Sequence, residues 1–169
     1  NSIAPTHVLH LAARTDTLSN VLSDYAVNMD GTANVLTAIK NTPSVQRVII
    51  TSTQYVNQFH GVPAHDLDYA PHTTYGKSKV ESERLTREAG LSCAWTFIRP
   101  TNIWGPYHPR YAQEFWRVLK QGCYIHPITE RPVIRSYGYV ENVVWQTAAL
   151  FEQPIDKINH QVFYVGDRP

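Results

Sequence analysis

The 169-residue sequence has little cysteine, no long apolar run and almost no net charge, and each absence excludes a class of protein. Its two cysteines, Cys93 and Cys123, have neither CxxC spacing nor the density of a disulfide-stabilised domain, which suits the reducing cytoplasm. The longest aliphatic stretch, Val48–Ile50, is far shorter than the ~20 apolar residues that cross a bilayer, so we expect no membrane protein. With 15 Lys+Arg against 14 Asp+Glu and no basic cluster, we expect a small-molecule partner and no nucleic acid.

Glycine-rich loops and metal-binding patterns are missing as well. The two closest of the eight glycines, Gly76 and Gly90, stand 14 positions apart, so the sequence contains no G-x-G-x-x-G loop that could hold a pyrophosphate. Eight histidines are present, but none belongs to an HExxH or Cys/His pattern. We therefore expect no metal site.

What the sequence does contain is the pattern of an α/β domain. Hydrophobic residues make up 43% of the chain, enough for a core, and short β-branched runs alternate with amphipathic segments of helical length. This alternation predicts a parallel sheet covered on both faces. Residues 1–100 are interpreted as the C-terminal half of a doubly wound sheet, and residues 101–169 as part of a smaller α/β domain appended to it. Strands are predicted at 7–13, 47–53, 93–98, 133–140 and 161–165, and helices at 18–40, 75–89, 111–120 and 142–151.

A tyrosine and a lysine stand four residues apart in one of the predicted helices. This spacing places Tyr75 and Lys79 on the same helix face, with Cβ atoms about 5–6 Å apart. A nearby ammonium favours the phenolate form and lowers the pKa of a phenol from its usual value of about 10, so the pair suits acid/base chemistry. Taken alone, the spacing equally suits an ordinary amphipathic helix with an exposed lysine and a half-buried tyrosine.

Hydroxyl side chains end the strand that precedes this helix. Thr51, Ser52 and Thr53 stand at its carboxyl end, the edge where open α/β sheets bind ligands. Thr53 is therefore a candidate to hold a substrate hydroxyl beside Tyr75. The alternative is a strand-end turn or a helix cap, because both use the same residue types.

Together these segments resemble the extended short-chain dehydrogenases/reductases, in particular the NAD(P)-dependent nucleotide-sugar epimerases and dehydratases. The resemblance covers nearly the whole chain and implies a Rossmann-like fold. Six segments match in the expected order, which is far more specific than any one match. They are Val8–Ala13, Asn28–Asn34, the hydroxyl-bearing Val48–Thr53, the Y-x-x-x-K pair of Tyr75–Lys79, Ile98–Pro106, and Arg135–Asn142.

The resemblance implies a hydride-transfer cycle in which three residues are catalytic. Tyr75 would remove a proton from a sugar hydroxyl while NAD or NADP takes hydride from the same carbon, giving a transient keto-sugar. Thr53 would hydrogen-bond that hydroxyl. Lys79 would bind the nicotinamide ribose and also tune Tyr75.

Further residues would bind the cofactor or the substrate in such an enzyme. Substrate contacts would come from Thr53, from Asn102 and from Arg135, whose guanidinium would grip a phosphate in a bidentate manner. Each of these residue types also has an ordinary explanation, such as a surface arginine or an Asx-turn. The cofactor contacts implied by the resemblance are Leu11, Ala12, Ala13, Tyr75, Lys79 and Pro100.

Two departures from the family pattern refine the expectation. Because the glycine loop is missing, the resemblance places the first three strands and the ribose-binding acid before Asn1. The strand near Val8 then becomes a sheet edge, which we expect the missing half or a neighbouring chain to cover. Gln54 and Tyr55 occupy the places where the dehydratases carry Asp-Glu, so epimerisation or reduction is favoured over dehydration.

The leading hypothesis is a nucleotide-sugar epimerase or a related oxidoreductase that is cytoplasmic and homodimeric, with this fragment inactive on its own. One alternative is an extended-type carbonyl reductase that acts on a non-nucleotide substrate. Another is a non-catalytic relative that only binds its ligand. Retention of the Thr53, Tyr75 and Lys79 set argues against the last alternative, because a binding protein needs no tuned phenol.

Overall fold

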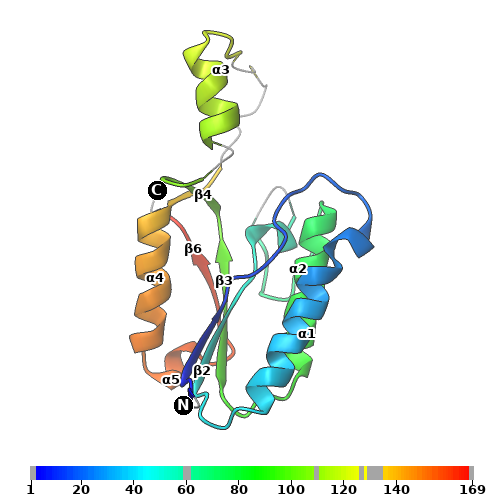
Figure 1. Ribbon diagram of the computed structural model, residues 1–169, viewed down its shortest axis with the longest axis vertical. Helices are drawn as coiled ribbons and strands as arrows, with labels where there is room; N and C mark the ends of the chain where they lie inside the picture. Colours follow the sequence, from blue (N-terminus) through cyan, green and yellow to red (C-terminus); the bar gives the residue numbers. More distant parts are fainter. Residues whose placement is uncertain (1–2, 59–61, 109–110, 126–127, 129–134, 168–169) are drawn as a thin grey trace.

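Four parallel strands form the main sheet of the computed structural model, which describes residues 3–58, 62–108, 111–125, 128 and 135–167. Their order across the sheet is β1-β2-β3-β6. Helices α1 (Ala26–Lys40) and α2 (Thr74–Glu88) cover one face, and α4 (Val140–Glu152) and α5 (Ile155–Ile158) cover the other (Figure 1). The prediction of a parallel sheet covered on both faces is confirmed. The strands are β1 (His7–His10), β2 (Arg47–Thr51), β3 (Ala94–Pro100) and β6 (Val162–Val165).

A second, two-stranded parallel sheet lies beyond the carboxyl ends of these strands (Figure 1). It consists of β4 (Asn102–Trp104) and β5 (Tyr137–Tyr139). Between them the chain forms a π-helical turn, η3 (Tyr111–Phe115), and α3 (Trp116–Lys120), which extend away from the main sheet. None of the described helices is long and apolar enough to cross a membrane.

The core follows from the alternation of side chains along β2. Val48 and Ile50 point to the side of α1 and pack in a cluster with Trp95 and Phe97. Ile49 points to the opposite side, where it packs in a cluster that includes Val143 of α4. Because successive residues of a strand face opposite sides, a continuous apolar run is what a strand buried on both faces requires.

Strand β1 is an edge of the sheet, as the sequence predicted. It pairs only with β2 among the described residues, in a register that places Val8 opposite Val48. Leu9 on this strand keeps 40% of its surface exposed. The expected edge is confirmed, and its exposed apolar side chain is of the kind that favours pairing with another chain.

The segment between β1 and α1 differs from the prediction, because helix α1 begins at Ala26 and not at residue 18. A single 3-10 turn, η1 (Leu22–Tyr25), precedes it. The carboxylate of Asp16 accepts the backbone N–H of Leu18, and the hydroxyl of Ser19 accepts that of Val21. Such side-chain bonds to nearby backbone groups compete with helix formation.

The other elements lie within a few residues of their predicted positions, with four differences. The first strand ends at His10 and not at residue 13, and of the range 133–140 the structure describes a strand only at Tyr137–Tyr139. Residues 133–134 lie outside the described part of the chain. Strand β4 and the short helix α5 were not predicted, because three and four residues are too few to show a period.

Candidate functional site

Helix α2 carries Tyr75 and Lys79 on its buried face. The helix is capped by Thr73, whose hydroxyl accepts the backbone N–H of Gly76 at 2.9 Å. Both predicted site residues are buried, and only 2% of Lys79 is exposed. The pair therefore does not fit the alternative of an exposed surface lysine. Their shared face is the one expected for residues four apart.

A 3-10 turn follows β2, begins after Thr53 and brings the Tyr55 ring against Tyr75. In this turn, η2 (Gln54–Val56), the hydroxyl of Thr53 accepts the backbone N–H of Tyr55 at 3.3 Å. The Tyr55 ring then lies 6.2 Å from the Tyr75 ring, in an edge-to-face arrangement. On another side, the Tyr25 ring lies 6.3 Å from Tyr75. Thr53 thus caps the turn whose Tyr55 ring lies against the ring of the candidate phenol.

Gly76 allows this turn to approach the helix. A Cβ at position 76 would overlap the carbonyl oxygen of Tyr55 and lie 3.1 Å from Pro71 and from the Thr73 hydroxyl. A backbone oxygen cannot move aside as a flexible side chain can. The glycine between Tyr75 and Lys79 is therefore required for the backbone of Tyr55 to approach the helix.

We expect Gly76→Ala to destabilise the fold by ~1–3 kcal/mol, because the added methyl forces the backbone apart. Gly31→Ala on α1 is the matched control, since a Cβ at Gly31 meets nothing within 4 Å. In that helix, alanine should raise the free energy of unfolding by up to ~1 kcal/mol. Urea unfolding of both variants measures the difference, and equal stability of the two would contradict the argument.

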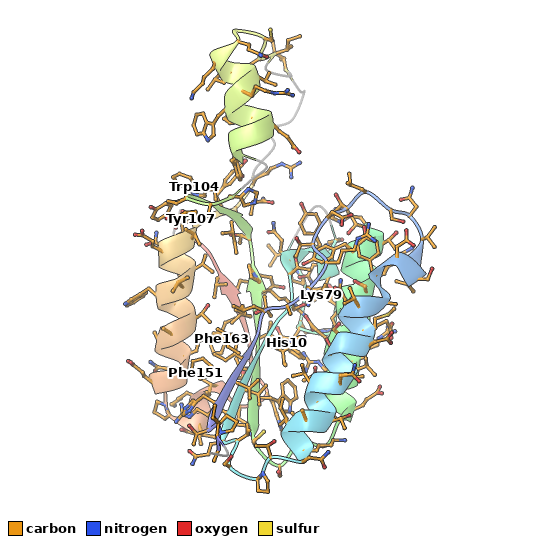
Figure 2. All side chains as sticks on the ribbon, viewed as in Figure 1. His10, Lys79, Trp104, Tyr107, Phe151 and Phe163 are labelled. Atoms are coloured by element: carbon orange, nitrogen blue, oxygen red, sulfur yellow. The ribbon has the colours of Figure 1, made fainter. Side chains whose placement is uncertain are left out.

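Burial and the charge of Glu83 act in opposite directions on the pKa of Lys79. Burial is the larger effect and lowers the pKa from 10.5 to about 8, while the carboxylate of Glu83 opposes this shift. Burial, followed by the Lys79 charge, lowers the pKa of His10 at the end of β1. Figure 2 shows His10 and Lys79 close together between the sheet and α2. Within the described part of the chain, the Lys79 ammonium has no hydrogen bond or ion pair.

The loop after β1 is tied to α2 by Asn28, a residue for which the sequence predicted no catalytic role. Its amide donates 3.0 Å hydrogen bonds to the carbonyl of Arg14 and the hydroxyl of Ser78, and its Oδ1 accepts the backbone N–H of Arg14 at 2.7 Å. Ser78 in turn donates to the carbonyl of Tyr75 at 2.7 Å. Asn28 thereby fixes the end of β1 against the helix that carries the phenol. The signal in the sequence was an asparagine within a predicted amphipathic helix, because such a side chain needs a hydrogen-bond partner if it is buried.

A buried ion pair behind α2 also escaped the sequence analysis. Arg99 of β3 donates from Nε and Nη2 to the two carboxylate oxygens of Glu83 at 2.9 and 2.8 Å, and both side chains are fully buried. The Tyr69 hydroxyl donates to the same carboxylate at 2.7 Å. The signal was available, because a lone arginine in an apolar strand needs a buried partner.

The predicted cofactor residues lie at the carboxyl ends of strands. Leu11, Ala12 and Ala13 follow β1, and the first two are exposed. Pro100 is the last residue of β3 and is buried. Parallel strands end at one edge, so these residues share it with Thr53, which follows β2. The structure places all of them where open α/β sheets bind ligands.

Two of the predicted substrate residues, Asn102 and Arg135, are brought near each other by the pairing of β4 with β5. Asn102 donates from its backbone and its side chain to the carbonyl of Ser136, at 3.2 and 3.0 Å. Arg135, the residue before Ser136, is exposed. Burial, then the phenols of Tyr137 and Tyr55, raise the pKa of Tyr111.

One cavity of the described residues lies outside this site. A cavity of about 330 Å³ opens at the amino ends of the strands, between Arg87, Gly90, Leu91, Trp95 and His160. It is at the opposite end of the sheet from Thr53. Among the described residues, no group of three or more His, Cys, Asp or Glu side chains could hold a metal ion.

Comparisons with known proteins match most of the chain. The model of the 3-beta hydroxysteroid dehydrogenase/isomerase family matches residues 4–169. The chain is 34% identical over 149 residues to N-acetyl-alpha-D-glucosaminyl-diphospho-ditrans,octacis-undecaprenol 4-epimerase of Escherichia coli O157:H7, covering 82% of this chain and 43% of that protein. It is 32% identical over 146 residues to human sterol-4-alpha-carboxylate 3-dehydrogenase, decarboxylating, covering 81% and 39%. The chain thus spans less than half of these curated relatives.

Solved structures share the fold. UDP-glucuronic acid 4-epimerase from Bacillus cereus, in complex with UDP-glucuronic acid and NAD, is similar over 97% of this chain and 55% of that one, with a TM-score of 0.78 and 21% identity. UDP-glucose 4-epimerase from Thermotoga maritima, with UDP-glucose, is similar over 96% and 55%, with a TM-score of 0.78 and 23% identity. At these identities the likeness establishes the fold, and the expected Rossmann-like architecture is confirmed.

Proposed function

Because the chain belongs to the 3-beta hydroxysteroid dehydrogenase/isomerase family, we propose that the whole protein is an NAD(P)-dependent oxidoreductase acting on a secondary hydroxyl, with nucleotide-sugar epimerisation as its leading reaction. The observation that carries this proposal is the placement of Tyr75 and Lys79 on one buried face of α2, together with Thr53 at the carboxyl end of β2, the edge where open α/β sheets bind ligands. The family resemblance supplies the reaction class, and the side chains present supply its acid/base group.

The cofactor edge has unpaired polar groups that suit a ribose. The hydroxyls of Thr51 and Ser52 are buried and make no hydrogen bond within the described part of the chain. The Lys79 ammonium has three donors and no described hydrogen-bond partner, whereas the hydroxyls of a nicotinamide ribose are acceptors. Leu11, Ala12, Ala13 and Pro100 would flank the same group. When bound, NAD or NADP supplies a hydride acceptor and donor.

Residues of this chain take up and return the proton of the substrate hydroxyl. Tyr75 takes it from the substrate hydroxyl as the carbon is oxidised and returns it after the transient keto-sugar is reduced on the other face. Lys79 favours the phenolate form of Tyr75 by its positive charge. Thr53 orients the hydroxyl. Since Gln54 and Tyr55 stand where a dehydratase has carboxylates, no acid/base pair is present there to eliminate water.

Asn102 and Arg135 are proposed to hold the sugar diphosphate, and Arg135→Ala tests this. If a nucleotide sugar is the substrate, loss of a guanidinium contact to phosphate should raise KM about 10-fold or more in the full-length protein while kcat changes less. Arg84→Ala is the matched control, because Arg84 is an exposed arginine of α2 whose carboxylate partner, Glu81, is also exposed. A KM unaffected by Arg135→Ala would contradict the nucleotide-sugar assignment.

The second candidate is an oxidoreductase of a non-nucleotide substrate. It is favoured by the family match and by relatives such as the human sterol-4-alpha-carboxylate 3-dehydrogenase and the Arabidopsis thaliana 3beta-hydroxysteroid-dehydrogenase/decarboxylase isoform 1, which is 32% identical. Reduction of NAD or NADP by the full-length protein with 3β-hydroxysterols, compared with UDP-sugars, separates the two. Binding without turnover of either class would favour the non-catalytic alternative.

The remaining proposals rest on the resemblance alone. Residues 1–100 are proposed as a partial dinucleotide-binding domain. Residues 101–169 were expected to form part of a substrate-binding region, but α4, α5 and β6 belong to the main sheet and its core, so this role is proposed for β4, β5 and the chain between them. The missing strands would pair with β1 and supply the pyrophosphate loop, so that the fragment alone would be inactive. Helices α1 and α2 are proposed to form a homodimer face in a cytoplasmic protein.

A further inference from the structure

Glu83 lies one helical turn after Lys79 on the same buried face of α2. Residues four apart on a helix are neighbours, so the carboxylate acts on the Lys79 ammonium from one turn away, with no ion pair within 4 Å between the two side chains. Glu83 and Lys79 are both buried, which keeps water from screening their interaction. The carboxylate is thus the nearest opposite charge on the element that carries the phenol.

The carboxylate is anchored from several other elements. Arg99 on β3 grips both of its oxygens, and Tyr69 donates to one of them. Arg99 also donates to the Tyr164 hydroxyl of β6 at 2.9 Å, and that hydroxyl donates to Asn57 at 2.6 Å. A carboxylate held in this way cannot turn toward or away from Lys79.

The other groups that face Lys79 do not balance its charge. His10 on β1 lies close to the ammonium, but burial and Lys79 both lower the pKa of its imidazole. Tyr75 is the phenol to be tuned. On the far side of Glu83, the Arg87 guanidinium approaches the carboxylate at 3.9 Å and adds a further positive charge. The Glu83 carboxylate therefore lies near three partly or fully buried cations, those of Lys79, Arg99 and Arg87.

We propose that Glu83 is a positioning residue that keeps Lys79 charged on the helix face that carries Tyr75. This inference rests on the proposed acid/base role of Tyr75. It assigns to the buried pair of Glu83 and Arg99 a task beyond holding α2 against β3. Without the carboxylate, Lys79 would lose its proton at lower pH, and the phenol would lose the charge that activates it.

The test is Glu83→Gln in the full-length protein, which keeps the shape of the side chain and removes its charge. We expect the alkaline fall in kcat, where Lys79 loses its proton, to move down by about one pH unit or more. Burial already places the pKa of Lys79 at about 8 with Glu83 present, so this shift enters the neutral range. A purely structural Glu83 would lower stability without moving the pH profile.

Glu81→Gln is the matched control, because Glu81 lies on the exposed face of α2 and pairs with Arg84 at 2.7 Å. Its pH profile should equal that of the unaltered protein. Should Glu83→Gln fail to fold, Glu83→Asp retains the charge on Arg99 but draws it back from Lys79. It is expected to give a smaller shift in the same direction, and no shift would overturn the proposal.

A second measurement separates this inference from the proposed function. The titration of Lys79 can be followed by NMR of ¹³C-labelled lysine side chains, with Lys79→Arg to assign the signal. A lower midpoint in Glu83→Gln supports the inference whatever the substrate is. An unchanged midpoint overturns it even if the enzyme is active. A lowered midpoint in a protein that turns over no hydroxyl substrate would reject the proposed function instead.

Discussion

Tyr75→Phe is expected to reduce turnover of the full-length protein about 10³-fold. The substitution removes only the phenolic oxygen and keeps the ring, which packs between Tyr25 and Tyr55 at centroid distances of 6.3 and 6.2 Å. The fold and the cofactor edge should therefore stay intact, since Lys79, Thr51 and Ser52 are untouched. What is lost is the group that takes the proton from the substrate hydroxyl.

Steady-state turnover and cofactor binding should be measured on the same preparation. Cofactor affinity should stay within about threefold, because the substitution removes one hydroxyl and leaves the other proposed cofactor contacts, Lys79 among them, in place. Tyr107→Phe is the control, since Tyr107 is fully exposed and its hydroxyl should be dispensable. Turnover that survives Tyr75→Phe would defeat the assignment of this residue as the acid/base.

Arg99→Met should lower the free energy of unfolding by ~3–5 kcal/mol. The side chains of Arg99 and Glu83 are both fully buried, so removing the guanidinium leaves a carboxylate without its charged partner in the interior. The Tyr69 hydroxyl remains, but one hydrogen bond does not replace a bidentate ion pair. This is the largest change in stability that we expect from one substitution in this chain.

The control for Arg99 is Arg84→Met, which removes an exposed partner of Glu81 and should cost less than ~1 kcal/mol. Chemical denaturation of both variants measures the difference. Combining Arg99→Met with Glu83→Gln should recover part of the loss, because the buried carboxylate that Arg99 paired with is then absent. A loss for Arg99→Met no larger than that for Arg84→Met would mean that the pair is screened by water.

The main sheet could be predicted because its strands are short apolar runs bounded by turn residues, as in Arg47–Thr51. The helix that carries Tyr75 was equally clear from its period and from Gly90 after its end. The segment before α1 was not, because the hydrogen bonds of Asp16 and Ser19 to the local backbone depend on the folded loop. Helix-like spacing alone does not reveal that competition.

The candidate site was predicted unevenly for a similar reason. Tyr75 and Lys79 lie four residues apart, so a local rule finds them. Glu83 and Arg99 are 16 residues apart, and Asn28 and Ser78 are 50 apart, so only the packing of α2 against β3 and α1 brings each pair together. Composition and spacing do not predict such contacts. They indicate only that a polar side chain stands in a segment expected to be buried.

The aromatic neighbours of Tyr75 have a consequence for stereochemistry. With rings on two sides and its own residue almost fully enclosed, the phenol has no room to swing from one side of a ligand to the other. A stationary base can reach only the face that is presented to it. If the protein epimerises its substrate as proposed, inversion at a carbon would therefore require the bound molecule itself to turn over relative to Tyr75.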